Sequence, residues 1–201
     1  MRLVVAHKPL KRILRCTQCV LFACALSLLA YCGFVLLEAR NFERVERLKL
    51  ETLMQDQVAL SDLPPVQLSI ANGDLIGSLE ISRLGLSAIV DEGTATATLR
   101  HAVGHIAGTA LPGRSGNIGI AGHRDTYFRP LRNVQKDDII TLTTAAGEYH
   151  YRVVFTKIVG PNDVAVLDPT GSEILTLVTC YPFYFVGPAP DRFIVRAERV
   201  T

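Results

Sequence analysis

The sequence lacks a strong net charge and the motifs of nucleotide or nucleic-acid binding. Its 201 residues carry 21 Lys and Arg against 19 Asp and Glu, a formal net charge of +2. It contains no basic stripe with interleaved aromatic residues, so we do not expect a nucleic-acid partner. The glycine-containing run from Gly108 to Gly116 ends without the Lys-Ser or Lys-Thr pair of a phosphate-binding loop, so we do not expect a nucleotide site.

Paired cysteines are also lacking in most of the chain. Four of the five cysteines lie in the first 32 residues, and Cys180 stands alone in the remainder. The Cys16-x-x-Cys19 pair has no second ligand pair, so we interpret it as two incidental thiols rather than a metal or redox site. Cys24 and Cys32 are interpreted as apolar residues of a membrane helix. Cys180 is therefore either buried and inert or the functional centre of its domain.

One long uncharged run predicts a membrane span. The segment from Val20 to Leu37 carries no charge over 18 residues, which as a helix is about 27 Å long, close to the thickness of a bilayer core. Lys8, Lys11, Arg12 and Arg15 precede it, so the positive-inside rule predicts a cytoplasmic N-terminus. A cleaved signal peptide is an alternative, but the apolar run continues too far. A lipid-modified Cys32 is disfavoured because Tyr31 precedes it.

The remaining chain divides into a stalk and a globular domain. Residues 38–65 mix charged and apolar residues without Gly until Pro64 and Pro65, which predicts a helical stalk or linker. A spacer role is preferred over partner binding through its apolar stripe. The predicted organisation is a cytoplasmic segment at 1–19, an anchor at 20–37, the stalk at 38–65 and a catalytic domain at 66–201.

Short β-like runs separated by turn residues dominate the last part of the chain. Their number predicts an all-β fold, either a closed barrel or a sandwich. Two short helices are also expected, Thr96 to Ala102 and Thr126 to Asn133. The predicted strands are Val66 to Ile70, Leu75 to Ile81, Leu86 to Val90, Asn117 to Ala121, Asp138 to Leu142, Tyr149 to Val159, Ile174 to Thr179 and Arg192 to Ala197.

Chemistry-bearing residues stand at the ends of three of these runs. Cys180 follows the apolar run Ile174 to Thr179, and Arg192 begins the next strand after a Pro-rich loop. His123 follows the glycine-containing run from Gly116 to Gly122. Sequential strands are usually neighbours, so Cys180 and Arg192 are expected to face one pocket.

These three residue types form a chemically complete set for acyl transfer. A histidine can support a cysteine thiolate and protonate a leaving amine, and a guanidinium can donate to the developing oxyanion. The other exocytoplasmic histidines are assigned structural roles: His150 to a strand surface, and His101 and His105 to a turn. Their spacing does not suggest a metal site. Arg196 and Arg199 are expected to be solvated.

These motifs resemble those of sortases, the membrane-anchored cysteine transpeptidases of bacterial surfaces. Thr176-Leu177-Val178-Thr179-Cys180 is similar to the family's TLxTC signature, Ala121-Gly122-His123-Arg124 to its histidine block, and Arg192 to its arginine after the cysteine. The resemblance covers roughly residues 75–200. The segments 104–113 and 180–183 look most like class D or a related proteobacterial group.

The resemblance implies an eight-stranded sortase-type β-barrel with His123 as acid/base, Cys180 as nucleophile and Arg192 as oxyanion stabiliser. Thr179 and Tyr181, which flank the cysteine, are expected in the substrate groove, which the loop 159–168 and the segment 181–186 would shape. The implied partners are surface proteins with an LPxTG-like sorting signal and an amine acceptor on a cell-wall precursor or protein.

The implied location is the bacterial plasma membrane, with the catalytic domain outside. No cofactor is expected, and no acidic cluster suggests calcium. A membrane-anchored cysteine peptidase that releases its product to water is one alternative. A non-catalytic stalked binding module, with Cys180 merely buried, is another.

Overall fold

The computed structural model describes residues 8–59, 71–185 and 187–200. The chain divides into two compact units, residues 1–42 and residues 43–201. A single long helix, α1 (Lys8–Ala59), contains the predicted span and most of the predicted stalk. Pro64, Pro65 and the predicted strand Val66 to Ile70 lie outside the described residues.

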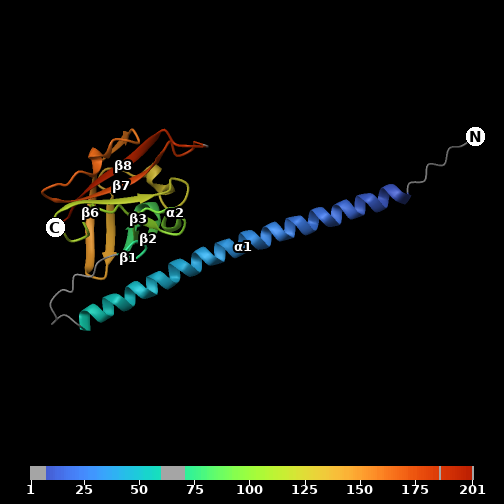
Figure 1. Cartoon of the computed structure of the whole chain (residues 1–201), viewed down its shortest axis with the longest axis horizontal. Helices are drawn as coiled ribbons and strands as arrows, with labels where there is room; N and C mark the ends of the chain where they lie inside the picture. Colours follow the sequence, from blue (N-terminus) through green and yellow to red (C-terminus); the bar gives the residue numbers. More distant parts are fainter. Residues whose placement is uncertain (1–7, 60–70, 186, 201) are drawn as a thin grey trace, which may run out of the picture. The chain divides into compact units, whose positions relative to one another are not determined.

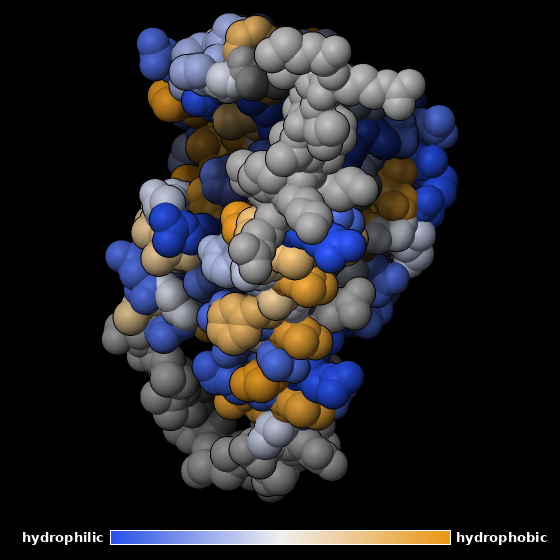
Figure 2. Space-filling model, turned by 90° about the vertical axis from the view of Figure 1, so that its right-hand side faces the viewer, coloured by the Kyte–Doolittle hydropathy of each residue, from blue (hydrophilic) through white to orange (hydrophobic). Residues whose placement is uncertain are grey.

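The apolar part of α1 could cross a membrane by length and composition. Its candidate span is Leu14–Val35, near the N-terminus. The large apolar side chains of this segment are exposed; Leu14, Leu21 and Leu29 retain 60%, 65% and 69% of their accessible surface. On the face of the molecule drawn in Figure 2, hydrophobic residues are exposed among hydrophilic ones. A helix of this length with exposed apolar side chains meets the length and composition requirements of a membrane span.

The second unit is built mainly of short strands. Alternating apolar residues form most of them, and turn residues separate them. Short helical turns occur between some strands: η1 (Ser82–Leu84), α2 (Thr96–Leu99), η2 (Arg129–Asn133) and η3 (Val164–Leu167). The strands are β1 (Leu75–Ile81), β2 (Leu86–Glu92), β3 (Val103–His105), β4 (Gly116–Gly122), β5 (Ile139–Thr144), β6 (Gly147–Val159), β7 (Glu173–Tyr181) and β8 (Asp191–Arg199).

The eight strands close into a barrel in the order β1-β2-β3-β4-β7-β8-β6-β5 (Figure 1). The pairs β2–β3 and β4–β7 are parallel, and the other pairs are antiparallel. The predicted all-β barrel is therefore confirmed, and the sandwich alternative is excluded. The parallel β4–β7 pair matters most for the site, because it brings the C-terminal ends of two strands together.

Side-chain alternation assigns the two faces of the β4, β7 and β8 strands. Ile118 and Ile120 of β4, Leu175 and Leu177 of β7, and Val195 of β8 fill the core with at most 1% exposure. Because successive side chains in a strand point to opposite faces, the residues between them lie on the outer face of the barrel. Cys180 and Arg192 belong to this outer set by the same alternation.

Seven of the predicted strands match β1, β2, β4, β5, β6, β7 and β8 to within a few residues. The strand β3 was not predicted. It has only three residues, and one of them is a glycine, so it carries no alternating pattern. The two expected helices are present in shortened form, as α2 and as the 3-10 turn η2.

Candidate active site

Three strand ends bring the predicted functional residues to one edge of the barrel. Cys180 of β7 is the direct antiparallel partner of Arg192 of β8. Side chains of directly opposite residues share a face, with Cβ atoms about 4.5–5.5 Å apart. In the parallel β4–β7 pair, Gly122 is the partner of Thr179. The next residues along the two strands, His123 and Cys180, are therefore neighbours at this edge.

The three side chains differ in their exposure to solvent. Cys180 and Arg192 are half-buried, and His123 is exposed. Arg192 donates from Nη1 to the carbonyl oxygens of Asp191 at 2.9 Å and Ala189 at 3.3 Å, which fixes one end of its guanidinium. The remaining guanidinium nitrogens carry further N–H donors. The thiol and the guanidinium thus lie on directly opposite residues of one sheet face, at a position that solvent can reach.

A tight turn after β4 fixes the backbone of His123. The amide of Phe128 donates to the carbonyl of His123 at 3.1 Å, and the Phe128 side chain is fully buried. A Cβ atom at Gly122 would lie 2.8 Å from a ring carbon of Phe128. Glycine is therefore required at position 122 for the ring to pack against the strand and close the turn.

Thr179 stabilises this edge of the barrel from its buried side. It is 2% exposed, and its hydroxyl donates to the Gly122 carbonyl at 2.7 Å. This burial does not fit the groove position expected from the sequence, because alternation turns Thr179 to the face opposite Cys180. The hydrogen bond instead ties the residue before Cys180 to the residue before His123.

Tyr181 lies in an aromatic cluster with Phe183 and Phe193. Its ring stacks on Phe193 at a centroid distance of 6.3 Å and meets Phe183 edge-on at 6.1 Å. Phe183 also meets Phe193 edge-on at 5.2 Å. All three residues are half-buried, so this cluster anchors the start of the segment 182–190 to β8.

Arg124, the residue after His123, connects its turn to the same segment. Its guanidinium donates to the carbonyl oxygens of Pro182 at 3.0 Å, Phe185 at 2.8 Å and Gly187 at 2.9 Å. It also lies 5.9 Å from the centre of the Phe185 ring. Sequence reasoning placed Arg124 only within a motif and gave it no role. Its long-range partners, 58 to 63 residues away, leave no local signal in the sequence.

The outer face of the barrel continues from Cys180 towards the turn η3. Asn117 donates from Nδ2 to the carbonyl oxygens of Val166 at 3.0 Å and Asp168 at 3.2 Å, and it accepts from the Thr176 hydroxyl at 2.6 Å. A Cβ atom at Gly119 would lie 3.0 Å from a methyl carbon of Leu167. The loop that carries η3 is thus held closely against β4, and Asn117 also ties β4 to Thr176 of β7.

Arg196 was expected to be solvated, and the structure corrects this prediction. The side chain is half-buried beside η3, and its Nη2 donates to the Val166 carbonyl at 2.9 Å. Burial lowers the pKa of its guanidinium below the ordinary value. The loop residue that covers this part of β8 is 30 positions away in the sequence. The residue pattern of β8 alone therefore could not predict the burial of Arg196.

His105 has the structural role that the sequence predicted. It is 2% exposed, its Nδ1 lies 2.6 Å from a carboxylate oxygen of Glu92, and its Nε2 lies 3.0 Å from the Ala110 carbonyl. A carbonyl can only accept, so Nε2 carries a hydrogen and donates it. Within the described part of the chain, no group of three or more His, Cys, Asp or Glu residues could hold a metal ion.

Comparison with known proteins shows the family to which the region with these three residues belongs. A family model for the sortase domain matches residues 79–200, a region that contains His123, Cys180 and Arg192. The chain belongs to the sortase family. The matched region comprises β2 to β8 and the last three residues of β1.

Several sortases share both sequence and structure with this chain. It is 39% identical over 130 residues to Sortase D of Bacillus subtilis, covering 64% of this chain and 66% of that protein. It is 33% identical over 132 residues to Sortase A of Listeria monocytogenes, covering 62% and 59%. These matches thus span less than two thirds of either relative.

A solved structure of a Clostridium perfringens Sortase D5 transpeptidase gives a TM-score of 0.63 at 29% identity, covering 79% of this chain and 99% of that one. This sortase therefore shares the barrel of structurally characterised sortases over most of its described length.

Proposed function

We propose that this sortase is a membrane-anchored cysteine transpeptidase. It would cleave an LPxTG-like sorting signal and transfer the acyl group to an amine of a cell-wall precursor or surface protein. The observation that carries the proposal is the strand register, in which Cys180 lies opposite Arg192 and the strand that leads to His123 pairs with β7. Similarity to Sortase D and to a Sortase D5 transpeptidase supports the class D type.

In the first half-reaction, the Cys180 thiolate attacks the carbonyl carbon of the scissile peptide bond. The carbonyl electrons move to oxygen, and Arg192 stabilises the oxyanion by hydrogen bonding from its guanidinium. As the oxyanion collapses, the C–N bond breaks and His123 gives a proton to the leaving amine. The product is a thioester between the substrate and Cys180.

In the second half-reaction, an acceptor amine attacks the thioester. His123, now neutral, takes a proton from the attacking nitrogen, and Arg192 again stabilises the oxyanion. The C–S bond then breaks, an amide forms, and Cys180 returns as a thiolate. Neither half-reaction, as written, uses a cofactor.

The N-terminal helix supports a location at the bacterial plasma membrane. Its candidate span, Leu14–Val35, lies close to the basic residues Lys8, Lys11 and Arg12. The positive-inside rule then favours a cytoplasmic N-terminus and an exocytoplasmic catalytic domain. Sorting-signal proteins at the outer surface of the membrane would be in reach of this domain.

Two alternatives make different predictions about Cys180. A hydrolase would use the same three residues but transfer the acyl group to water. A non-catalytic binding module would bury the thiol. The half-buried position of Cys180 opposite a guanidinium favours a reactive thiol over an inert one.

The proposal is tested by mass spectrometry of the full chain in detergent. The protein is incubated with LPxTG-like peptides in the presence and absence of an added amine. The expected results are an acyl adduct on Cys180 and, with the amine present, an amide product. Cys180→Ala should abolish the adduct, and Arg192→Ala should slow its formation by about 100-fold or more, as for loss of other oxyanion donors. Arg152→Ala, at an exposed position on β6, is the control and should have little effect.

Cleavage to the free acid alone, at every amine concentration, would instead support the hydrolase. Absence of any adduct, together with a Cys180 that resists alkylation, would leave only the binding module.

A further inference from the structure

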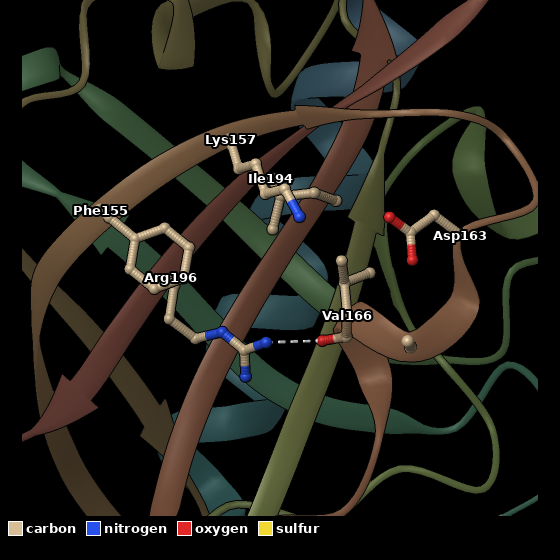
Figure 3. A pocket seen from close by; sticks show the side chains of 7 residues that line it. Phe155, Lys157, Asp163, Val166, Ile194 and Arg196 are labelled. Atoms are coloured by element: carbon tan, nitrogen blue, oxygen red, sulfur yellow. Dashed lines mark hydrogen bonds between the residues drawn. The ribbon is translucent and has the colours of Figure 1, made fainter.

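A cavity lies on the outer face of the barrel beside η3, away from Cys180. Its volume is about 220 Å³, and residues of the strands β6 and β8 and of the segment around η3 line it (Figure 3). We call it the η3 pocket. The residues that define it are Phe155, Lys157, Asp163, Ala165, Val166, Ile194 and Arg196.

The guanidinium of Arg196 is the unusual group of this pocket. Its Nη2 donates to the Val166 carbonyl, but its Nε is buried without a hydrogen-bond partner. Within the part of the chain that the structure describes, no ion pair is formed by Arg196. A half-buried cation without an anionic partner is costly unless a ligand supplies the missing charge. Burial also lowers the pKa of this group, which reflects the same cost.

The remaining lining fits an anionic group on an apolar stem. Lys157 adds a second cation, and Asp163 is the one acid among the residues that line the pocket. Phe155 retains 49% of its surface, so its ring is available to a ligand, whereas Ile194 belongs to the lining but is only 1% exposed. A volume of about 220 Å³ lies below the 300–1,000 Å³ typical of small-molecule sites. The pocket therefore suits one side chain of a bound peptide better than a free cofactor.

The strand register relates the η3 pocket to the nucleophile. Arg192, Ile194 and Arg196 alternate along β8 and share one face, and Arg192 is the partner of Cys180. Four residues of strand separate Arg192 from Arg196, which corresponds to about 13 Å at about 3.3 Å per residue. An extended peptide advances by the same distance per residue. A side chain four residues from the residue that is bonded to Cys180 can therefore reach the pocket.

We propose that the η3 pocket binds an acidic side chain of the acyl-donor peptide, four residues upstream of the residue whose carbonyl acylates Cys180. This inference rests on the proposed function. The upstream segment is chosen because it remains attached to Cys180 after the leaving group departs. An Asp or Glu there would accept hydrogen bonds from Arg196 and Lys157, and its stem would pack on the exposed ring of Phe155.

The test compares peptides that differ at a single upstream position. Full chain in detergent is incubated with peptides that carry Glu, Gln, Ala or Lys at each position from three to six residues upstream. The rate of adduct formation on Cys180 is measured by mass spectrometry. We expect Glu to exceed Gln by about tenfold at the fourth position, the size of one charge-assisted hydrogen bond. The Gln peptide reports the proposed transpeptidase separately, because it lacks the charge.

Variants of the lining residues test whether the preference for the Glu peptide arises in the η3 pocket. The ratio of Glu to Gln rates should fall to about one in Arg196→Gln and should decrease in Lys157→Gln, a change at an exposed position that the fold tolerates. Arg196→Glu should prefer the Lys peptide. Arg152→Gln, which removes an exposed cation of β6 outside the pocket, should keep the original ratio.

Equilibrium binding covers the case in which no peptide acylates Cys180. Fluorescently labelled Glu and Gln peptides are then titrated against Cys180→Ala, with and without Arg196→Gln. The same tenfold preference would support the pocket even if the proposed reaction failed. The inference is overturned by equal rates and affinities for Glu and Gln, by an acid preference downstream of the acylating residue, or by a preference that Arg196→Gln and Lys157→Gln both retain.

Discussion

The substitution Asp91→Asn should stabilise the barrel at neutral pH. Asp91 lies on β2 and is 4% exposed. The pKa of this carboxyl is raised from its ordinary value of 3.8 to about 6, chiefly by burial and also by the nearby charge of Glu46, while Lys49 opposes the rise. At neutral pH the folded chain therefore carries a buried negative charge at this position.

The sign of the effect follows from proton linkage. The folded state holds its proton to a higher pH than the unfolded state, so folding loses stability as the pH rises from about 4 to above 6. A pKa difference of about two corresponds to a penalty of about 3 kcal/mol once both states are ionised. Asn keeps the shape of the protonated carboxyl and does not ionise. The variant should therefore gain up to about 3 kcal/mol at pH 8 and almost nothing at pH 4.

Urea unfolding of the full chain in detergent, at several values between pH 4 and pH 8, measures this difference. Asp137→Asn, at an exposed position before β5, is the matched control and should show no comparable dependence on pH. An Asp91→Asn variant that is no more stable than the parent at pH 8 would refute the reasoning. A gain that stays constant across the pH range would refute it equally, because the effect would then not arise from ionisation.

Three further predictions concern the polar contacts. Hydrogen bonds from Arg83 lower the pKa of Asp138, so their contribution to folding stability is present above the ordinary value of 3.8 and is lost as the pH falls. Arg83→Met should therefore be less stable than the parent at pH 7 in urea unfolding. A stability deficit that persists at pH 2 would contradict this. Arg124→Met should lower kcat/KM for peptide acylation by about tenfold or more, with Arg124→Lys between it and the parent, and equal rates would exclude a positioning role. His105→Gln and Glu92→Gln should each lower the free energy of unfolding by about 3–5 kcal/mol, and the double variant should lose less than the sum of the two. Additive losses in this double-mutant cycle would show that the two residues are not coupled.

The sequence predicted most strands because their signals are local. Runs such as Leu75–Ile81 and Tyr149 to Val159 carry β-branched and aromatic residues between turn residues, and these patterns act within a few positions. The strand β3 escaped detection for the opposite reason. Its three residues become a strand through parallel pairing with β2 and antiparallel pairing with β4. Both partners lie elsewhere in the chain, so the residues of β3 alone do not predict the pairing.

The same difference between local sequence signals and long-range contacts applies to the residues of the site. Cys180, His123 and Arg192 were predicted from their residue types and strand-end positions, and the strand register brings these positions to one edge of the barrel, while their catalytic roles stay predictions. Arg196 was misjudged because η3 buries it from elsewhere in the chain. The Thr179 side chain was expected in the groove, yet the period-two alternation that turns Cys180 outward turns its neighbour inward.

The parallel pairing of β4 and β7 explains how distant residues form one site. Parallel strands end at the same edge of a sheet, so the residues that follow Gly122 and Thr179 emerge together although 57 positions separate the two partners in the chain. The antiparallel strand β8 starts where β7 ends, which brings Arg192 to the same edge. The positions of Cys180, His123 and Arg192 thus depend on backbone register and on the Thr179–Gly122 hydrogen bond. Changes in the loops between these strands can therefore alter the surroundings of the site, including the η3 pocket, while the strand register that positions the three residues is kept.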